Sequence, residues 1–216
     1  MVAIIISVVV MLVLVVLDQV SKYFIVSAFD MGQHIGKLDL DALEAIVEGL
    51  EPIELIPGVL NFRFVLNDGA AFGSMDNARW IFMILSTVAI IAILVYMFWK
   101  KPQNKLLLVS LTLITGGGIG NMIDRVALGY VIDFIDFCAF PKLWMWVFNV
   151  ADSCVTVGAA LLALWMIIDV VKDIRREKGK KLAVAEVETD AVAEVEVEAG
   201  MDETVENGDT DDRNDE

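Results

Sequence analysis

The chain is organised around residues 121–152, which contain three polar motifs: NMIDR (121–125), GYVIDF (129–134) and FNVAD (148–152). These motifs place three aspartates, one arginine and two asparagines beside or inside segments that otherwise read as membrane-spanning. Ionisable side chains are costly in hydrocarbon, so in membrane segments they mark functional positions by default. Two of them, Asp133 and Asp152, are candidates for a paired-carboxylate active site.

The composition is that of a polytopic membrane protein. Apolar residues make up 57% of the 216 positions, and the mean hydropathy is +0.68, which is too apolar for a soluble domain of this length. The formal net charge of −15 is unevenly distributed, because residues 182–216 hold 14 acidic residues and a single basic one, Arg213. The rest of the chain is close to neutral, and nothing in it indicates a nucleic-acid partner.

Long apolar runs predict four membrane spans, at about 2–27, 80–99, 106–124 and 143–171. Within the first span, Asp18 and Lys22 are four residues apart in the favourable acid-first order, which predicts a neutralised pair on one helix face. The third span contains Gly116, Gly117, Gly118 and Gly120. Small residues in a span indicate close packing of helices.

The segment between the first two spans combines a helical and a strand pattern. Apolar residues recur near helical period between 40 and 50, and Asp41 followed by Glu44 has the form of a capping box, so we expect a short helix on the membrane surface. Residues 60–67 alternate between apolar and polar and follow a Pro57-Gly58 turn, which predicts a half-buried strand.

The distribution of basic residues predicts the orientation. The loop at 100–105 and the flank at 173–181 are rich in lysine and arginine, so both are expected in the cytoplasm, together with both termini. Segments 28–79 and 126–142 then lie outside, and the polar motifs converge at the outer membrane face. Asp152 comes nine residues after Leu143, or ~13 Å into the fourth span. The composition of residues 182–216 predicts a disordered tail.

The converging groups suit acid–base hydrolysis. The clusters contain no histidine, cysteine pair or serine with a base, so we expect neither a metal site nor a cofactor. Two aspartates held close together cannot both ionise, and such a pair can hydrolyse a peptide bond through an activated water. Residue types alone leave open which of these aspartates form the pair: Asp18, Asp124, Asp133, Asp136 and Asp152. A small ion-coupled carrier and a non-enzymatic scaffold are the alternatives.

The motifs resemble those of signal peptidase II, the prolipoprotein signal peptidase of bacteria. Five blocks occur in the family's order: DQVSK (18–22), NDGAAFG (67–73), GNMIDR (120–125), GYVIDF (129–134) and FNVADS (148–153). The resemblance implies a membrane α-helical fold for residues 1–172, with four transmembrane helices, a small extracytoplasmic antiparallel β-cradle and a short interfacial helix. Residues 30–51 look longer than the corresponding family segment, and the acidic tail lies outside the pattern.

The resemblance also implies an activity and a set of site residues. It implies an aspartyl endopeptidase of the bacterial cell membrane, with its active site at the extracytoplasmic face, that cuts prolipoproteins just before a diacylglyceryl-modified cysteine. Membrane lipid is the other expected partner. The implied catalytic pair is Asp133 and Asp152. The residues that match substrate-holding or orienting positions are Asn67, Gly69, Asn121, Arg125 and Asn149, and those that match structural polar positions are Asp18, Lys22 and Asp124.

Overall fold

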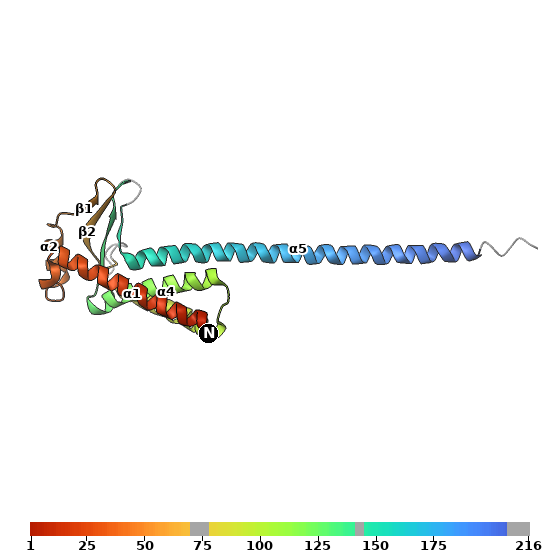
Figure 1. Ribbon diagram of the computed structural model, residues 1–216, viewed down its shortest axis with the longest axis horizontal. Coiled ribbons are helices and arrows are strands. Elements are labelled where there is room, and N and C mark those ends of the chain that lie inside the picture. Colours follow the sequence, from red (N-terminus) through yellow and green to blue (C-terminus); the bar gives the residue numbers. More distant parts are fainter. Residues whose placement is uncertain (70–77, 141–144, 207–216) are drawn as a thin grey trace, which may run out of the picture. The chain divides into compact units, whose positions relative to one another are not determined.

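The computed structural model describes residues 1–69, 78–140 and 145–206, and it divides into two compact units, Met1–Trp165 and Met166–Glu216. The first unit combines membrane-length helices with a small sheet (Figure 1). Its elements in chain order are α1 (Val2–Ala28), the 3-10 helix η1 (Met31–Gln33), α2 (Leu40–Val47), β1 (Ile53–Ile56), β2 (Leu60–Asn67), α3 (Ala78–Lys100), α4 (Lys105–Ala127), β3 (Val131–Phe137), β4 (Val147–Phe148) and the first part of α5 (Val150–Glu206).

Four helices in the described part of the chain are long and apolar enough to cross a membrane: Val2–Ala28, Met83–Lys100, Lys105–Ala127 and Val150–Gly179. The prediction of a four-span membrane fold is therefore confirmed, and α1, α3 and α4 cover the first three predicted spans. The fourth predicted span began too early, because Val147 and Phe148 form strand β4. A short apolar run suits a buried strand as well as a helix, and periodicity does not separate the two.

The four strands form one antiparallel sheet in the order β1-β2-β3-β4. Strand β2 has the bounds that its alternation predicts, and Gly58 in the preceding turn has a φ of +69°, a conformation that glycine adopts without strain. Strand β3 lies in the predicted outer segment 126–142, whose local pattern predicted no strand, and it pairs Val131 with Asn67 and Phe137 with Leu60. In Figure 1 the strands run across the direction of α1 and α4.

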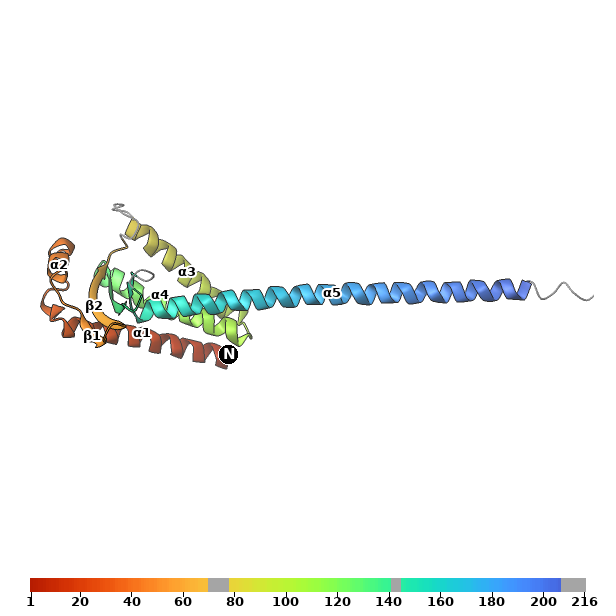
Figure 2. The same cartoon turned by 90° about the horizontal axis from the view of Figure 1, so that it is seen from above.

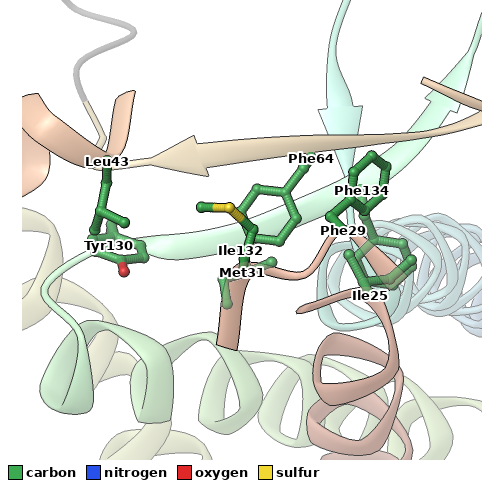
Figure 3. Packing of buried hydrophobic residues seen from close by; sticks show 8 residues of the cluster. All are labelled: Ile25, Phe29, Met31, Leu43, Phe64, Tyr130, Ile132 and Phe134. Atoms are coloured by element: carbon green, nitrogen blue, oxygen red, sulfur yellow. The ribbon is translucent and has the colours of Figure 1, made fainter. Parts of the chain in front are cut away.

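The sheet packs on the C-terminal end of α1 and on α2 through one apolar cluster. Figure 3 shows its buried residues: Ile25, Phe29, Met31, Leu43, Phe64, Tyr130, Ile132 and Phe134. Leu43 brings α2 into this cluster, so the predicted amphipathic helix is present. Its N-cap is Asp39 rather than Asp41, because the Asp39 carboxylate accepts the Ala42 N–H at 2.9 Å. Asp41 lies inside the first turn.

Two glycines of α4 allow the helices to approach closely. A Cβ on Gly117 would collide with the carbonyl oxygen of Ala151 on α5, and a Cβ on Gly120 would lie 2.7 Å from an Asp18 carboxylate oxygen on α1. The glycine-rich stretch of α4 thus packs against both helices, as small residues in a span predict.

The second unit continues α5 as a helix to Glu206 (Figure 2). Disorder was predicted for 182–216, and this is wrong for 182–206, while 207–216 lie outside the described residues. Alanine and glutamate are frequent in this segment and are strong helix formers. A composition that cannot build a packed core can still satisfy its own backbone in a helix, since helical hydrogen bonds are local.

Candidate active site

Asp133 lies in the middle of the sheet with both carboxylate oxygens bonded to asparagine amides. It stands on β3 opposite Val65 of β2, and only 1% of it is exposed. Asn67, at the end of β2, donates its side-chain N–H to Asp133 Oδ2 at 2.8 Å. Asn149 donates to Asp133 Oδ1 at 2.7 Å. The sheet register therefore fixes the carboxylate of Asp133.

Asp152 is fixed by the start of α5. Asn149 and Asp152 form a reciprocal capping box, in which the Asp152 N–H donates to Asn149 Oδ1 at 2.8 Å and the Asn149 N–H donates to Asp152 Oδ2 at 3.2 Å. Asn121 of α4 donates its amide to the other carboxylate oxygen at 2.6 Å. Asp152 thus lies in the first helical turn, and the expected depth of nine residues inside a span is wrong.

Asn149 joins the two aspartates. Its side-chain amide donates to Asp133 while its backbone N–H donates to Asp152, and the residue is fully buried. A third contact, from Asn149 Nδ2 to Asn121 Oδ1 at 3.0 Å, closes the network. The spacing Asn-x-x-Asp before an apolar helix is the signal in the sequence that could have predicted this cap.

The pKa of Asp133 is raised to about 7, first by burial and second by the negative charge of Asp152. Hydrogen bonds from Asn67 and Asn149 and the charge of Lys22 act in the opposite direction. The result is a carboxyl group that changes protonation near neutrality beside a second carboxylate. Such a pair can supply one acid and one base at the same time.

A second polar layer, centred on Lys22, surrounds this pair. The ammonium group forms ion pairs of 2.8 Å with Asp18 and with Asp124, and both acids are buried. The predicted pairing of Asp18 with Lys22 is confirmed. Lys22 also donates to Asn121 Oδ1 at 3.0 Å, so it fixes the orientation in which the Asn121 amide donates to Asp152.

The two acids of this layer also bind backbone amides next to the site. Asp18 accepts the N–H of Ala151 at 2.9 Å, and Asp124 accepts the N–H of Ile132 at 3.2 Å. Each contact fixes the backbone of the residue that directly precedes a candidate catalytic aspartate. Gln19, which sequence reasoning missed, donates to Asp124 at 2.9 Å and to the Gly120 carbonyl at 3.2 Å.

Comparison with known proteins gives the same family as the motifs. The profile of the family described as "Signal peptidase (SPase) II" matches residues 10–168. The chain belongs to the signal peptidase II family. It is 40% identical over 166 residues to a lipoprotein signal peptidase of Symbiobacterium thermophilum, which covers 75% of this chain and 94% of the relative. A lipoprotein signal peptidase of Halalkalibacterium halodurans is 34% identical over 175 residues, covering 81% and 97%.

Two solved structures of bacterial membrane enzymes share this fold. One bacterial membrane enzyme, determined in meso at 2.3 Å resolution, aligns with a TM-score of 0.60 and 30% identity over 76% of this chain and 88% of its own. A second, at 1.9 Å resolution, gives a TM-score of 0.59 and 29% identity over 74% and 91%. None of these comparisons supports the carrier alternative.

Within this signal peptidase II member, Asp133 and Asp136 lie on the same strand but have different surroundings. The two residues are three apart on one strand, so their side chains point to opposite sheet faces. Gly69 holds the side chain of Asn67, because the Gly69 N–H donates to Asn67 Oδ1 at 3.0 Å. Its φ of +87° is a conformation that glycine adopts without strain. Arg125 is half-buried on α4, and no hydrogen bond or ion pair joins it to either aspartate within the described residues. The small residues at 70–73 lie outside the described part of the chain.

Proposed function

We propose that this signal peptidase II member is an aspartyl endopeptidase that removes signal peptides from prolipoproteins, with Asp133 and Asp152 as its catalytic pair. The observation that carries the proposal is the position of Asn149, which donates one N–H to each of the two carboxylates. Asp18 and Asp124 are less suited, because both are ion-paired to Lys22 and bonded to backbone amides.

The proposed chemistry divides the roles of acid and base. Asp133, with its pKa raised to about 7, carries a proton and donates it to the oxygen of the scissile carbonyl. Asp152, in the role of base, removes a proton from a water molecule, whose oxygen forms a bond to the carbonyl carbon. When the tetrahedral intermediate collapses, the C–N bond breaks and Asp152 gives its proton to the departing amine. Asp133 then takes back the proton of the hydroxyl group.

The place of the pair in the fold supports a substrate that is itself anchored in the membrane. Asp152 lies in the first turn of α5, and Asp133 lies on a strand that starts four residues after α4 ends. A signal peptide lying along the spans would present its C-terminal end at this level. We propose that the bond cleaved is the one before a diacylglyceryl-modified cysteine, whose acyl chains remain in the lipid.

The proposed topology follows from the basic residues. The positive-inside rule supports a cytoplasmic location for the basic loop between α3 and α4, the basic flank at 173–181 and both termini; the loop carries Lys100, Lys101 and Lys105. The active site then faces the extracytoplasmic side of the cell membrane. Residues 1–172 form the peptidase domain, and the helical extension beyond the flank lies outside it.

A gel-shift assay tests the proposal. Purified protein in detergent is given one prolipoprotein with and without diacylglyceryl on its cysteine, next to the variants Asp133→Asn, Asp152→Asn and Asp136→Asn. We expect cleavage of only the lipidated substrate, lost in the first two variants and retained in the third. Cleavage that survives Asp152→Asn would contradict the proposed pair, and cleavage of the unlipidated form would contradict the proposed substrate.

A further inference from the structure

Large apolar side chains are exposed at one end of the sheet. We call this group the sheet tip, and its members are 37–73% exposed: Leu55, Ile56, Val59, Phe140, Met145 and Trp146. They come from two places in the chain: the end of β1 with the turn that follows it, and the segments that follow β3 and precede β4. Contiguous apolar surface of this kind indicates contact with another phase or partner.

Hydrogen bonds and strand pairing bring these two places together. The Cys138 N–H donates to the Val59 carbonyl at 3.0 Å, and Phe137 pairs with Leu60. The rings of Phe137 and Phe140 are 6.1 Å apart, and Val147, directly after Trp146, pairs with Asp136. The sequence from Leu55 to Phe62 contains no charged residue. The two segments of the sheet tip therefore lie side by side, and the segment between β1 and β2 carries no ionised group.

The sheet tip lies at the end of the sheet that points away from α1 and α4 (Figure 1). The opposite end is held at the helices, since β3 starts only four residues after α4 and pairs there with Asn67. Because the strands run across the helix direction, the tip stays at about the same level along the helices as the rest of the sheet.

Contacts of α1 define that level. Ile25 and Phe29 belong to the apolar cluster that contains Phe64 and Phe134 of the sheet, whereas Tyr23 and Phe24 of the same helix are 70% and 65% exposed. A helix that spans a membrane exposes such aromatic residues where hydrocarbon meets the lipid head groups. The sheet therefore lies at the depth of the interface rather than far above it.

We propose that the sheet tip inserts into the interfacial layer of the same lipid leaflet that surrounds the C-terminal end of α1. The partner is a phospholipid surface, because the tip is continuous in depth with the lipid-facing surface of the spans. Its aromatic and aliphatic side chains are those that favour this layer. Insertion would fix the sheet, and with it Asp133, at a constant height relative to the lipid.

Fluorescence quenching in phosphatidylcholine–phosphatidylglycerol vesicles tests whether the sheet tip inserts into lipid. The full-length protein retains Trp146 as its only tryptophan, with Trp80, Trp99, Trp144 and Trp165 replaced by phenylalanine. The control carries Arg63→Trp, at an exposed charged position of β2, in a background where Trp146 is also replaced. We expect lipids brominated near the head group to quench Trp146 about twofold more strongly than the control, and acrylamide to show the opposite order.

A cysteine-attached fluorophore tests the same insertion without removing tryptophans, in case their removal impairs folding. Val59→Cys, in a chain with Cys138→Ala and Cys154→Ala, is labelled with a polarity-sensitive fluorophore, and Arg63→Cys serves as its control. A blue-shifted emission at Val59 that brominated lipid quenches supports insertion. Equal access of acrylamide to the tip and the control would overturn it. Protection of the tip from both quenchers would also overturn it and would indicate a protein partner or a second copy.

Discussion

At the scale of single residues, Asn149 has two functions that substitution can separate. It caps α5 and it bonds to both aspartates. Asn104 caps α4 in the same way, accepting the Leu107 N–H at 3.1 Å, but it contacts neither aspartate. We expect Asn104→Ala to lower the free energy of unfolding by about 1 kcal/mol, as loss of a cap does. Asn149→Ala should lower it further, because its buried side chain also bonds to Asp133 and Asn121.

Only Asn149→Ala should lower kcat, by about a hundredfold, because it alone releases a carboxyl group of the proposed pair. Denaturant unfolding in detergent and the gel-shift assay measure the two effects. Equal activity of the two variants would show that the contact between Asn149 and Asp133 is dispensable.

The raised pKa of Asp133 also predicts how stability and activity change with pH. Its pKa in the folded protein, about 7, is above the ordinary value of 3.8, so between these values the folded state binds the proton more tightly than the unfolded state. The contribution to stability is complete below about pH 4 and declines as the pH rises through about 7. Activity that needs the protonated acid should decline over the upper part of the same range.

Asp133→Asn should remove this pH dependence of the unfolding midpoint, while Asp136→Asn should leave it unchanged. Thermal unfolding of the three proteins between mildly acidic and mildly alkaline pH gives the comparison. A wild-type midpoint that does not fall toward alkaline pH would contradict the raised pKa.

At the scale of elements, some parts of the fold could be predicted from local pattern and others could not. Strand β2 has the bounds that alternation predicts, and the Asp18–Lys22 pair follows from helical spacing. Strand β3 was missed because its side chains are buried on both faces at its start, so it shows no alternation.

The start of α5 was missed for a related reason. Before it, an apolar run continues directly into the helix, and only the polar pair Asn149 and Asp152 marks the boundary. The candidate pair could be named only through resemblance. Tertiary contact rather than sequence spacing favours Asp133 over Asp136, Asp18 and Asp124 as a member of the proposed pair.

Packing between α4 and α5 gives a prediction at the same scale. Gly117→Ala would place a Cβ against the Ala151 carbonyl, which belongs to backbone, whereas Gly118→Ala would meet only the end of the Ile90 side chain at 3.2 Å. Both substitutions gain up to about 1 kcal/mol of helix propensity. We expect Gly118→Ala to be neutral or stabilising, and Gly117→Ala to destabilise the protein and to displace Asp152.

Thermal unfolding in detergent and the cleavage assay distinguish these outcomes. If Gly117→Ala were as stable and as active as Gly118→Ala, the close approach of α4 to Ala151 would not be needed for the site.

At the scale of the whole molecule, the acidic extension at 182–216 is predicted to be dispensable for cleavage. The match to the Symbiobacterium thermophilum relative uses 75% of this chain and covers 94% of that relative. The match to the Halalkalibacterium halodurans relative uses 81% of this chain and covers 97% of that relative. Residues 182–216 carry 14 acidic residues and no motif of the site. Truncation after Lys181 should therefore leave kcat/KM and Tm of the purified enzyme unchanged within error. A clear loss of activity in the truncated enzyme would give the acidic extension a role in cleavage.

The capping box at the start of α5 has a consequence for biogenesis. Under the proposed chemistry, the bonds that hold Asp152 in place are the same bonds that begin the last membrane helix. A nascent chain whose final span has not yet entered the bilayer has no such helix terminus, and so it has no assembled carboxylate pair. Completion of membrane insertion would then assemble the carboxylate pair.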